Sequence, residues 1–380
     1  MTGTAVGERA RVLHVLEAIE GGTSRHLVDV VTHAKGTEHI VAVPARRIGG
    51  ATDETALPLL RASGADVRLL PMRRTPWSPA NVVAVARVRR LIRSVHPDVV
   101  HGHSSIGGLL ARLAATGTGR PAVYTPNGIT PVRAGVLVER AMRRRTGVLV
   151  AVSPSEAELA VRLRIIGRPD VVVIRNGVEL DPPLPPLDLR THLGLTPGTT
   201  LVGTIARLVP QKAPEDFVSA CQIVSETVPE VRFVMIGSGK LEADVDAAVA
   251  RAGLRDRFYR IPTLPGAAGV LGQLDVFALS SRFEGAPYAP LEAMRAGTPV
   301  VLTAVVGSRD TVEDGVSGLI VPPGDPRALA DAIAALLIDP DRRQRLGEAG
   351  RNRVAEHFDV RIMGASLDVL YDEIRRGRRA

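Results

Sequence analysis

The stretch Asp181-Pro-Pro-Leu-Pro-Pro-Leu-Asp188 divides the chain into two halves that repeat one pattern. Four prolines between positions 182 and 186 exclude both a helix and a central strand, so this segment is predicted to be a stiff, exposed linker. On either side of it, short apolar runs alternate with segments of helical spacing. The linker, residues 181–188, therefore predicts a boundary between two domains.

Before the linker, the apolar runs have the character of buried strands. Val148–Val152 and Val171–Ile174 are apolar at successive positions rather than at alternate ones. This is typical of parallel strands that helices cover on both faces. Pro79–Val95 has apolar residues at helical spacing. We therefore predict a doubly wound, Rossmann-like α/β domain over residues 1–180.

After the linker the pattern starts again, with strands expected at Thr200–Ala206 and Val231–Ile236 and a helix between them at Pro214–Glu226. We expect a second α/β domain over residues 189–358 and a C-terminal helix, residues 359–380, that packs back on the first domain. Open parallel sheets bind ligands beyond the carboxyl ends of their strands. Two such domains predict a ligand-binding cleft between them.

The composition narrows the class of protein. With 380 residues, 45% hydrophobic and 23% charged, the chain has enough apolar surface for large cores, which excludes a disordered chain or a small disulfide scaffold. Its single cysteine, Cys221, allows neither an internal disulfide nor a thiolate zinc cluster. No run approaches the ~18 apolar residues of a membrane span, and Glu8, Arg9 and Arg11 stand where a secretory signal would be apolar. We expect a cytoplasmic protein.

The net charge of +8 is unevenly distributed. Residues 1–180 contain 25 basic and 14 acidic side chains, whereas residues 181–380 contain 23 and 26. A basic surface attracts anionic membranes, anionic substrates or nucleic acid. Nucleic acid is the least favoured of these, because the chain has only 11 aromatic residues and the basic clusters of the first half lack interleaved aromatics for stacking.

Two cations follow the first strand of the second half. Arg207 and Lys212 lie in Gly203-Thr-Ile-Ala-Arg207 and Val209-Pro-Gln-Lys212, and Lys212 is one of only three lysines in an arginine-rich sequence. A forked guanidinium and a point-charged ammonium suit a diphosphate. From the residues alone, this interpretation and a solvated loop are equally favoured.

Two carboxylates, Glu284 and Glu292, flank the predicted start of a helix near Pro290, with seven residues between them. They could accept hydrogen bonds from the hydroxyls of two parts of one ligand, although Glu292 could instead interact with the helix dipole. In the first half, Gly21-Gly22 lies between a strand and a helix. There it could bring backbone N–H groups close to an anion, or form an ordinary tight turn.

Histidines are concentrated in the first half, with His101 and His103 at the end of a predicted strand. We expect these two side chains to face opposite sides of the strand and not to share a metal ion. A structural or hydrogen-bonding role is favoured for a lone histidine in such a position. Trp77, the only tryptophan, could line a ligand-binding loop, although a hydrophobic plug is favoured.

Together these stretches resemble the retaining GT-B glycosyltransferases of family 4, also called group 1, over nearly the whole chain. The most specific matches are in the second half, and the first half is similar at Glu20–Leu27, His101–Ser104 and Ile174–Val178. The motifs of the second half occur in the order and spacing of the family: Val202–Lys212, Ile236–Glu242, Ser281–Gly285, Leu291–Met294, Ala296–Val300 and Asp314–Gly324.

The resemblance implies a GT-B fold of two Rossmann-like domains and a nucleotide-sugar donor held mainly by the second. Arg207 and Lys212 would neutralise the diphosphate, and Glu284 would bind the hydroxyls of the donor sugar. Glu292 would bind the ribose, Gly22 would approach the distal phosphate, and His103 would border donor sugar and acceptor. Further donor contacts are expected from Gly285, Ala286, Pro287, Tyr288 and Leu291.

The resemblance also implies a reaction without a metal or other cofactor, because two cations and a helix N-terminus can stabilise a diphosphate leaving group. No carboxylate stands out as the nucleophile of a double displacement, so we expect front-face attack with retention. The sequence departs from the family pattern twice, with Asn127 in place of a common histidine and Asp310 in place of the usual glutamate. Since asparagine cannot act as a base, Asn127 is not expected to activate an acceptor.

The basic first domain is the expected acceptor side. Arg73, Arg74 and the arginines at 87–93 and 140–145 could bind anionic lipid headgroups or a lipid-linked acceptor. We expect transfer of a hexose, from a UDP-sugar in preference to GDP-mannose, in exopolysaccharide, capsule or other envelope glycan assembly at the inner face of the plasma membrane. Two alternatives stay open: a soluble small-molecule or natural-product acceptor, and a catalytically silent nucleotide-binding or scaffold protein.

Overall fold

The computed structural model describes residues 9–46, 54–76, 78–182, 187–262, 264 and 266–379. Trp77 and residues 183–186 of the proline-rich linker lie outside the described residues. The chain forms two compact units: unit 1 comprises residues 1–177 and 360–380, and unit 2 comprises residues 178–359. Unit 2 begins a few residues before the predicted linker, because the amide of Val178 donates to the carbonyl of Phe358 (2.8 Å).

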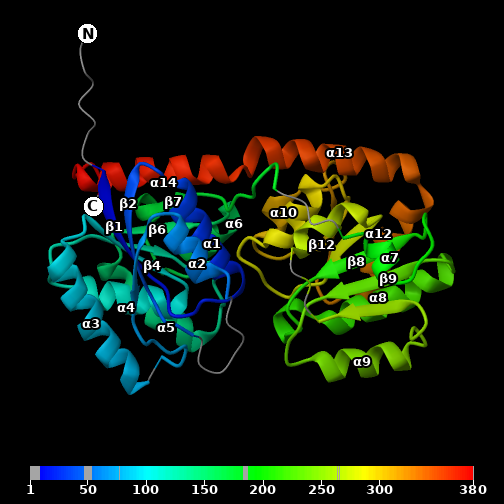
Figure 1. Ribbon diagram of the computed structural model, residues 1–380, viewed down its shortest axis with the longest axis horizontal. Helices are drawn as coiled ribbons and strands as arrows, with labels where there is room; N and C mark the ends of the chain where they lie inside the picture. The colour runs from blue at the N-terminus through cyan, green and yellow to red at the C-terminus, as the bar shows by residue number, and fades with distance from the viewer. Residues whose placement is uncertain are drawn as a thin grey trace, which may run out of the picture. The chain divides into compact units, whose positions relative to one another are not determined.

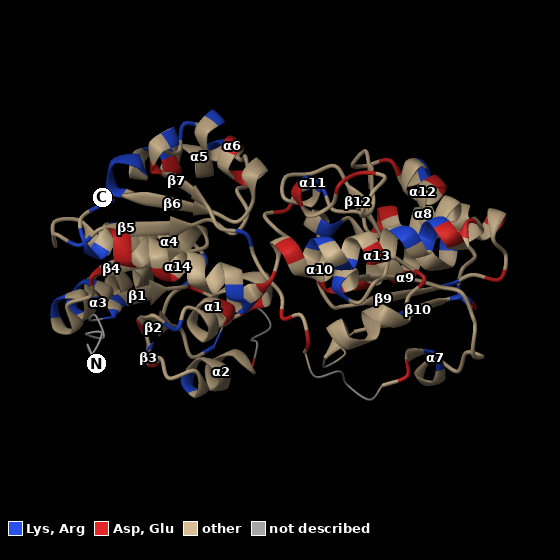
Figure 2. Cartoon of the chain, turned by 90° about the horizontal axis from the view of Figure 1, so that it is seen from above, with Lys and Arg blue, Asp and Glu red and all other residues tan. Residues whose placement is uncertain are grey.

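Unit 1, whose strands are blue to green in Figure 1, is built on a seven-stranded sheet. Its strands lie in the order β3-β2-β1-β4-β5-β6-β7, which Figure 2 shows, and all neighbours are parallel. Its strands are β1 Ala10–Val15, β2 Thr37–Val43, β3 Asp66–Leu69, β4 Val99–His103, β5 Ala122–Thr125, β6 Val148–Ala151 and β7 Val171–Val173.

Helices cover both faces of this sheet. One face packs against α1 and α14, with Val12, Val99 and Val123 meeting Leu367 and Leu370 of α14. The other face packs against α3 and α4. The helices of unit 1 are α1 Gly21–His33, α2 Ala56–Ala62, α3 Pro79–Val95, α4 Ser105–Ala115, α5 Arg133–Met142, α6 Pro154–Arg162 and α14 Val360–Arg375, with 3-10 helices η1 Arg143–Arg145 and η2 Arg168–Asp170.

Unit 2 repeats the architecture with a six-stranded parallel sheet in the order β10-β9-β8-β11-β12-β13. Its elements are β8 Leu201–Ile205, β9 Arg232–Ile236, β10 Phe258–Ile261, β11 Val276–Leu279, β12 Val300–Thr303, β13 Leu319–Val321, α7 Leu189–His192, α8 Pro214–Thr227, α9 Glu242–Arg251, α10 Tyr288–Arg295, α11 Ser308–Thr311, α12 Pro326–Ile338, α13 Pro340–His357, η3 Pro210–Lys212 and η4 Ala267–Gln273.

The core of unit 2 is apolar on both faces of its sheet. Phe233 and Val276 face α8, α9 and α12, whereas Phe277 and Leu302 face α10, α13 and η4. The prediction of two doubly wound α/β domains is thereby confirmed. Among the described helices, none combines the length and the apolar character needed to cross a bilayer.

Each sheet has a point at which the strand order reverses. In unit 1 this point lies between β1 and β4, and in unit 2 between β8 and β11. The connections that leave the carboxyl ends of two such strands run in opposite directions, which leaves a crevice where ligands bind in sheets of this kind. A ligand site is therefore expected at these two strand pairs.

Candidate functional site

In unit 2, the loops after β8 and β11 bring two of the predicted residues into contact. Lys212, at the end of η3, donates from Nζ to Oε1 of Glu284 over 2.5 Å. The side chains are 15% and 6% exposed. The same carboxylate oxygen accepts a hydrogen bond from Ser281 Oγ (2.5 Å). The residues expected to bind the phosphate and the sugar are therefore direct neighbours in unit 2.

Hydrogen bonds from side chains to backbone carbonyls hold these two loops together. Ser280 Oγ donates to the carbonyls of Lys212 (3.0 Å) and Ala213 (2.9 Å), and Gln211 Nε2 donates to the carbonyl of Phe283 (3.0 Å). Ala213 has a φ of 45°, in the left-handed region, which ends η3 and starts α8. The position of Lys212 is thus determined by loop contacts as well as by its own ion pair.

Two glycines let neighbouring loops approach the site closely. A Cβ on Gly239 would lie 2.3 Å from the carbonyl oxygen of Leu208, in the loop that carries Arg207. A Cβ on Gly307, whose φ is 80°, would lie 1.9 Å from the carbonyl oxygen of Gly285. Since no side chain fits at either position, both glycines are required by the packing of these loops.

The remaining predicted donor residues lie around the start of α10. Pro287 precedes the helix, Tyr288 is its first residue, and Glu292 is half-buried one turn later. Gly285 is buried and Ala286 is half-buried. The side chain of Leu291 is only 1% exposed and belongs to the apolar core, so it can contribute to a ligand site through its backbone alone. Arg207 follows β8 directly and is exposed.

In unit 1, the predicted residues Gly22 and His103 lie at β1 and β4, the two strands at the reversal. Gly22 follows β1, and His103 is the last residue of β4. Helix α1 begins at Gly21, whose φ is 60°, and Gly22 is exposed in its first turn. This turn contains no acidic residue, and the residue before it, Glu20, makes no side-chain cap. The N-terminus of α1 therefore has the positive dipole end that the interpretation as an anion site needs.

The prediction that His101 and His103 face opposite sides of their strand is wrong. Their ring centroids lie 4.1 Å apart, on the sheet face that α14 covers. Residues two apart on a strand share a face, because side chains alternate with a period of two. His101 hydrogen-bonds to Tyr371 Oη of α14 (2.7 Å) and to Thr125 Oγ1 (2.8 Å), so its role is structural.

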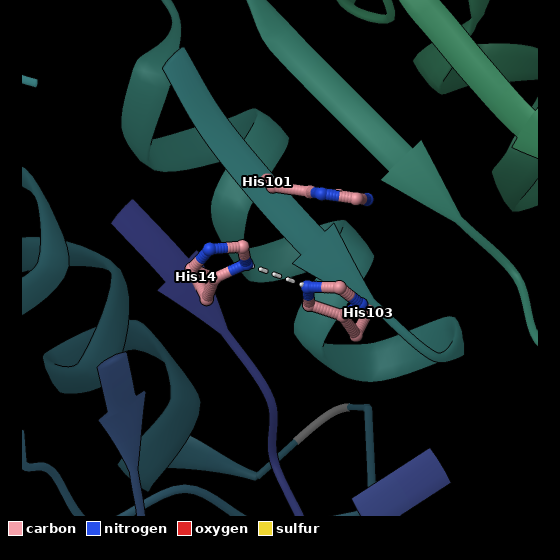
Figure 3. Close-up of side chains that lie close together, drawn as sticks. All are labelled: His14, His101 and His103. Carbon is pink, nitrogen blue, oxygen red and sulfur yellow. Dashed lines mark hydrogen bonds between the residues drawn. The ribbon is translucent and has the colours of Figure 1, made fainter. Parts of the chain in front are cut away.

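His103 belongs to a larger cluster of buried histidines that the sequence did not predict. His14 Nδ1 lies 3.0 Å from His103 Nε2, as Figure 3 shows, and His14 Nε2 lies 3.0 Å from His39 Nδ1. Burial, followed by repulsion among the rings, lowers the pKa of His14, His101 and His103 well below the ordinary value. Burial also lowers the pKa of His26 to about 4.

Three histidines of this cluster are also close enough together to hold a metal ion. His14, His101 and His103 each offer one nitrogen, and these atoms lie within 4.8 Å of one another. The nitrogens that face each other already share hydrogen bonds, as do both nitrogens of His101. A metal ion would have to replace these bonds, so the geometry favours a hydrogen-bonded cluster.

Two buried glutamates shape the loops beside His103. Glu17 accepts hydrogen bonds from Ser104 Oγ (3.0 Å) and the amide of Gly107 (2.9 Å), and burial raises its pKa. Glu156 accepts from the amides of Gly128 (2.7 Å) and Val152 (2.8 Å), and burial raises its pKa to about 7. The one signal for these residues in the sequence is a charged side chain next to an apolar strand.

The two departures from the family pattern lie in separate units. Asn127 has a φ of 55°, and its Nδ2 is buried without a partner among the described residues. Asp310 is half-buried in α11, where its carbonyl accepts from Arg353 Nη2 (3.1 Å). Nothing in the structure assigns a chemical role to either side chain.

Unit 1 also contains an apolar cavity of about 280 Å³ next to α5. Tyr124 and Glu139 lie in its wall, joined by a hydrogen bond from Tyr124 Oη to Glu139 Oε1 (3.1 Å). The arginines 140 and 143–145, at the end of α5 and in η1, are exposed, and Figure 2 shows the basic residues gathered there and on α3. The other wall residues are mainly apolar and include Ile106, Leu109, Ile129, Val136 and Ile165.

Comparison with known proteins agrees with this arrangement. Residues 188–353 match the family model "Glycosyl transferases group 1", and residues 20–182 match "Glycosyltransferase Family 4". A D-inositol 3-phosphate glycosyltransferase of Xylanimonas cellulosilytica is 32% identical over 310 residues, which cover 74% of this chain and 73% of the relative. The UDP-Gal:alpha-D-GlcNAc-diphosphoundecaprenol alpha-1,3-galactosyltransferase of Escherichia coli is 27% identical, with 71% and 74% covered.

The fold is also that of solved structures. Alr3699/HepE of Anabaena, crystallised with UDP and glucose, superimposes with a TM-score of 0.82 at 20% identity, covering 96% of this chain and all of the other. This likeness identifies the two doubly wound units as a GT-B fold. The family models and the Xylanimonas relative together establish that the chain belongs to the group 1, or family 4, glycosyltransferases.

Proposed function

We propose that the chain transfers a hexose, with retention, from a UDP-sugar in preference to GDP-mannose to a hydroxyl group of an acceptor. The observation that carries this proposal is the contact between Lys212 and Glu284 at the strand reversal of unit 2. An ammonium has three hydrogens, so Lys212 can bind a phosphate oxygen while it still donates to Glu284. Glu284 keeps its second oxygen for a sugar hydroxyl.

The other donor contacts follow from the same placement. Arg207, in the exposed loop after β8, would bind the diphosphate together with Lys212, and Glu292 in α10 would accept from the ribose hydroxyls. The backbone of residues 285–288 would hold the sugar, and Gly22 in the first turn of α1 would face the distal phosphate. UDP is the favoured nucleotide of the donor, because the Anabaena structure contains UDP and the Escherichia coli relative is named for UDP-Gal.

The proposed reaction breaks the bond between the anomeric carbon and the leaving phosphate oxygen. The acceptor oxygen bonds to the same face of that carbon, and its proton passes to the leaving phosphate oxygen. Arg207 and Lys212 would stabilise the charge that develops on the diphosphate, so we propose that no metal ion is required. Trapping of a covalent adduct between the sugar and an Asp or Glu side chain would contradict front-face attack. Loss of activity in EDTA would contradict a reaction that needs no metal ion.

For the acceptor, we propose a lipid-linked intermediate of exopolysaccharide, capsule or another envelope glycan, met at an anionic membrane surface. The support is the apolar cavity beside α5 together with the exposed arginines at its end. Each such charge contributes about 1 kcal/mol near an anionic bilayer. The acceptor named for the Escherichia coli relative is a diphosphoundecaprenol, which combines a long apolar chain with phosphates.

A second candidate acceptor is a soluble phosphorylated small molecule. The Xylanimonas relative is named for D-inositol 3-phosphate, whose phosphate would also suit the exposed arginines of unit 1. Co-sedimentation with vesicles of phosphatidylglycerol and phosphatidylcholine distinguishes the two. Salt-sensitive binding that is lost with pure phosphatidylcholine favours the lipid-linked acceptor at a membrane. Failure to bind either vesicle excludes the membrane surface and favours the soluble acceptor.

The donor is tested by thermal unfolding with UDP, GDP and their sugars, because a ligand that binds only the folded protein raises its melting temperature. We expect UDP and a UDP-hexose to stabilise more than GDP, and Lys212→Ala and Glu292→Ala to reduce this effect. Lys35→Ala, at an exposed site in unit 1, is the control. If no donor is hydrolysed or transferred and neither variant changes nucleotide binding, the chain is a silent family member or scaffold.

A further inference from the structure

Three histidines of neighbouring strands form a continuous hydrogen-bonded chain in unit 1. His39 is on β2, His14 on β1 and His103 on β4, and these strands are adjacent in the order β2-β1-β4. His39 Nε2 lies 2.9 Å from the carbonyl oxygen of Ala34, and both links between the rings are 3.0 Å. His14 and His103 are fully buried, and His39 is 8% exposed.

The direction of this chain is determined at its end, because a carbonyl oxygen can only accept. His39 therefore carries its hydrogen on Nε2, and a neutral imidazole has only one N–H, so His39 Nδ1 is an acceptor. His14 must then donate from Nε2, which leaves His14 Nδ1 as the acceptor for His103 Nε2–H. The last ring is left with a bare Nδ1.

This bare nitrogen lies in a place suited to a ligand. His103 Nδ1 is buried and has no hydrogen-bond partner among the described residues. His103 follows the strand reversal of unit 1, and its ring centroid lies 5.5 Å from that of His26. His26 donates from Nδ1 to Asn176 Oδ1 (3.0 Å), so its Nε2, also buried and without a described partner, is a second bare acceptor.

We propose that His14 and His39 are positioning residues that hold His103 in its Nε2–H tautomer, so that His103 Nδ1 accepts a hydrogen bond from a hydroxyl group of the substrate. Only the substrate part of this inference rests on the proposed function. The tautomer itself follows from the carbonyl of Ala34 and the order of the three rings. His103 then cannot donate a proton from Nδ1 to the substrate, so it acts there as an acceptor.

The first test is imidazole ¹⁵N NMR of the full chain labelled at histidine, without substrate, near pH 7.5. Protonated and bare ring nitrogens have distinct chemical shifts, so each tautomer is measured directly. We expect a hydrogen on Nε2 and a bare Nδ1 for His14, His39 and His103. A hydrogen on His103 Nδ1, or a doubly protonated ring, overturns the inference. So does stoichiometric Zn²⁺ that shifts the His14, His101 and His103 signals together.

Two substitutions at His39 test the relay itself. His39→Phe removes the acceptor for His14 Nε2–H, so His14 and His103 should populate both tautomers and kcat should fall about tenfold at unchanged KM for the donor. His39→Asn offers an oxygen in the place of Nδ1 and should restore both the tautomer and kcat. His192→Phe, an exposed histidine of unit 2, is the control and should change neither.

The outcomes also separate this inference from the proposed function. A single Nε2–H tautomer in a protein that transfers no sugar contradicts the proposed function and leaves the relay intact. An active transferase in which His39→Phe leaves the His103 tautomer and kcat unchanged contradicts the relay. If His39→Phe does not fold, the spectrum of the unaltered chain and that of His39→Asn still decide the tautomer.

Discussion

The two units share an architecture but carry different side chains at their strand reversals. In unit 2, the loops after β8 and β11 carry a partly exposed ammonium and a carboxylate, Lys212 and Glu284. In unit 1, the ends of β1 and β4 carry fully buried imidazoles, His14 and His103, whose pKa values burial lowers. Unit 2 therefore offers charge to a ligand, whereas unit 1 offers neutral hydrogen-bonding groups. This difference suits charged contacts to a diphosphate in unit 2, and neutral hydrogen bonds in unit 1 from the imidazoles and the first turn of α1.

The largest expected effect is that acid destabilises unit 1 before unit 2. Histidines 14, 26, 39, 101 and 103 are buried in unit 1, and the pKa of each is lowered by burial. Below pH ~6.5 the unfolded chain binds protons that the folded one does not, so the free energy of unfolding falls by about 1.4 kcal/mol per pH unit for each such histidine. Stability is thus retained above pH ~6.5 and lost on acidification.

Hydrogen exchange at pH 7.5 and 5.0, resolved by peptide, measures this effect. Amides of unit 1 should lose several kcal/mol of protection at pH 5.0, since its five buried histidines act together and outweigh Glu17 and Glu156, whose raised pKa values act in the opposite direction. Unit 2 is the internal control, because the described residues of that unit include no buried histidine. Equal loss of protection in both units would show that the imidazoles do not distinguish them.

The next effect concerns the charge of unit 2. Lys212→Gln keeps a hydrogen-bond donor for Glu284 but removes the positive charge, so the affinity for UDP should fall about thirtyfold, or about 2 kcal/mol, the usual worth of a charge-assisted hydrogen bond. Calorimetric titration measures it, and Lys35→Gln is the control. An unchanged affinity would place the diphosphate elsewhere.

A smaller effect is expected from the loop packing beside Glu284. Gly307→Ala places a methyl group against the carbonyl of Gly285 and also strains a φ of 80°. Gly315→Ala has a similar φ of 75° but an added Cβ there meets nothing within 4 Å. We expect Gly307→Ala to lower the free energy of unfolding by about 2 kcal/mol and Gly315→Ala by about 1 kcal/mol. Equal melting temperatures for the two variants would argue against the close loop contact.

The smallest effect is at the structural histidine of unit 1. Tyr371→Phe removes the hydroxyl that hydrogen-bonds to His101 Nδ1 and should cost about 1 kcal/mol in urea unfolding. Tyr259→Phe in unit 2 is the control, because the described residues offer its hydroxyl no partner and its loss should be nearly neutral. A neutral Tyr371→Phe would mean that this hydrogen bond does not help to hold α14, and that its apolar contacts and the hydrogen bonds of Asp368 do so.

The sequence predicted most of the architecture because the strands are short apolar runs and the helices have clear spacing. The helix at Pro79–Val95 was predicted with the bounds that the structure has. Strand β5 was not predicted, because its run has only four residues, Ala122–Thr125, before the turn at Pro126-Asn127-Gly128. Strand β10 was missed because Arg260 interrupts its apolar run, and the structure explains that residue by its ion pairs with Glu242 and Asp246.

The candidate site was predictable only in part. Lys212 and Glu284 were found because family motifs mark them, yet their contact depends on the adjacency of β8 and β11. The histidine relay depends on the order β2-β1-β4, which no spacing along the chain reveals. His101 and His103 lie on the same face of β4, as the two-residue period of a strand requires, so the prediction of opposite faces is wrong.

The most direct test of the difference between the units is His103→Gln, assayed for both UDP affinity and sugar transfer. If unit 2 binds the diphosphate and His103 acts on a hydroxyl group, UDP affinity should stay within about twofold of the unaltered chain while kcat falls at least about tenfold. A loss of UDP affinity as large as that in Lys212→Gln, with kcat unchanged, would contradict this account.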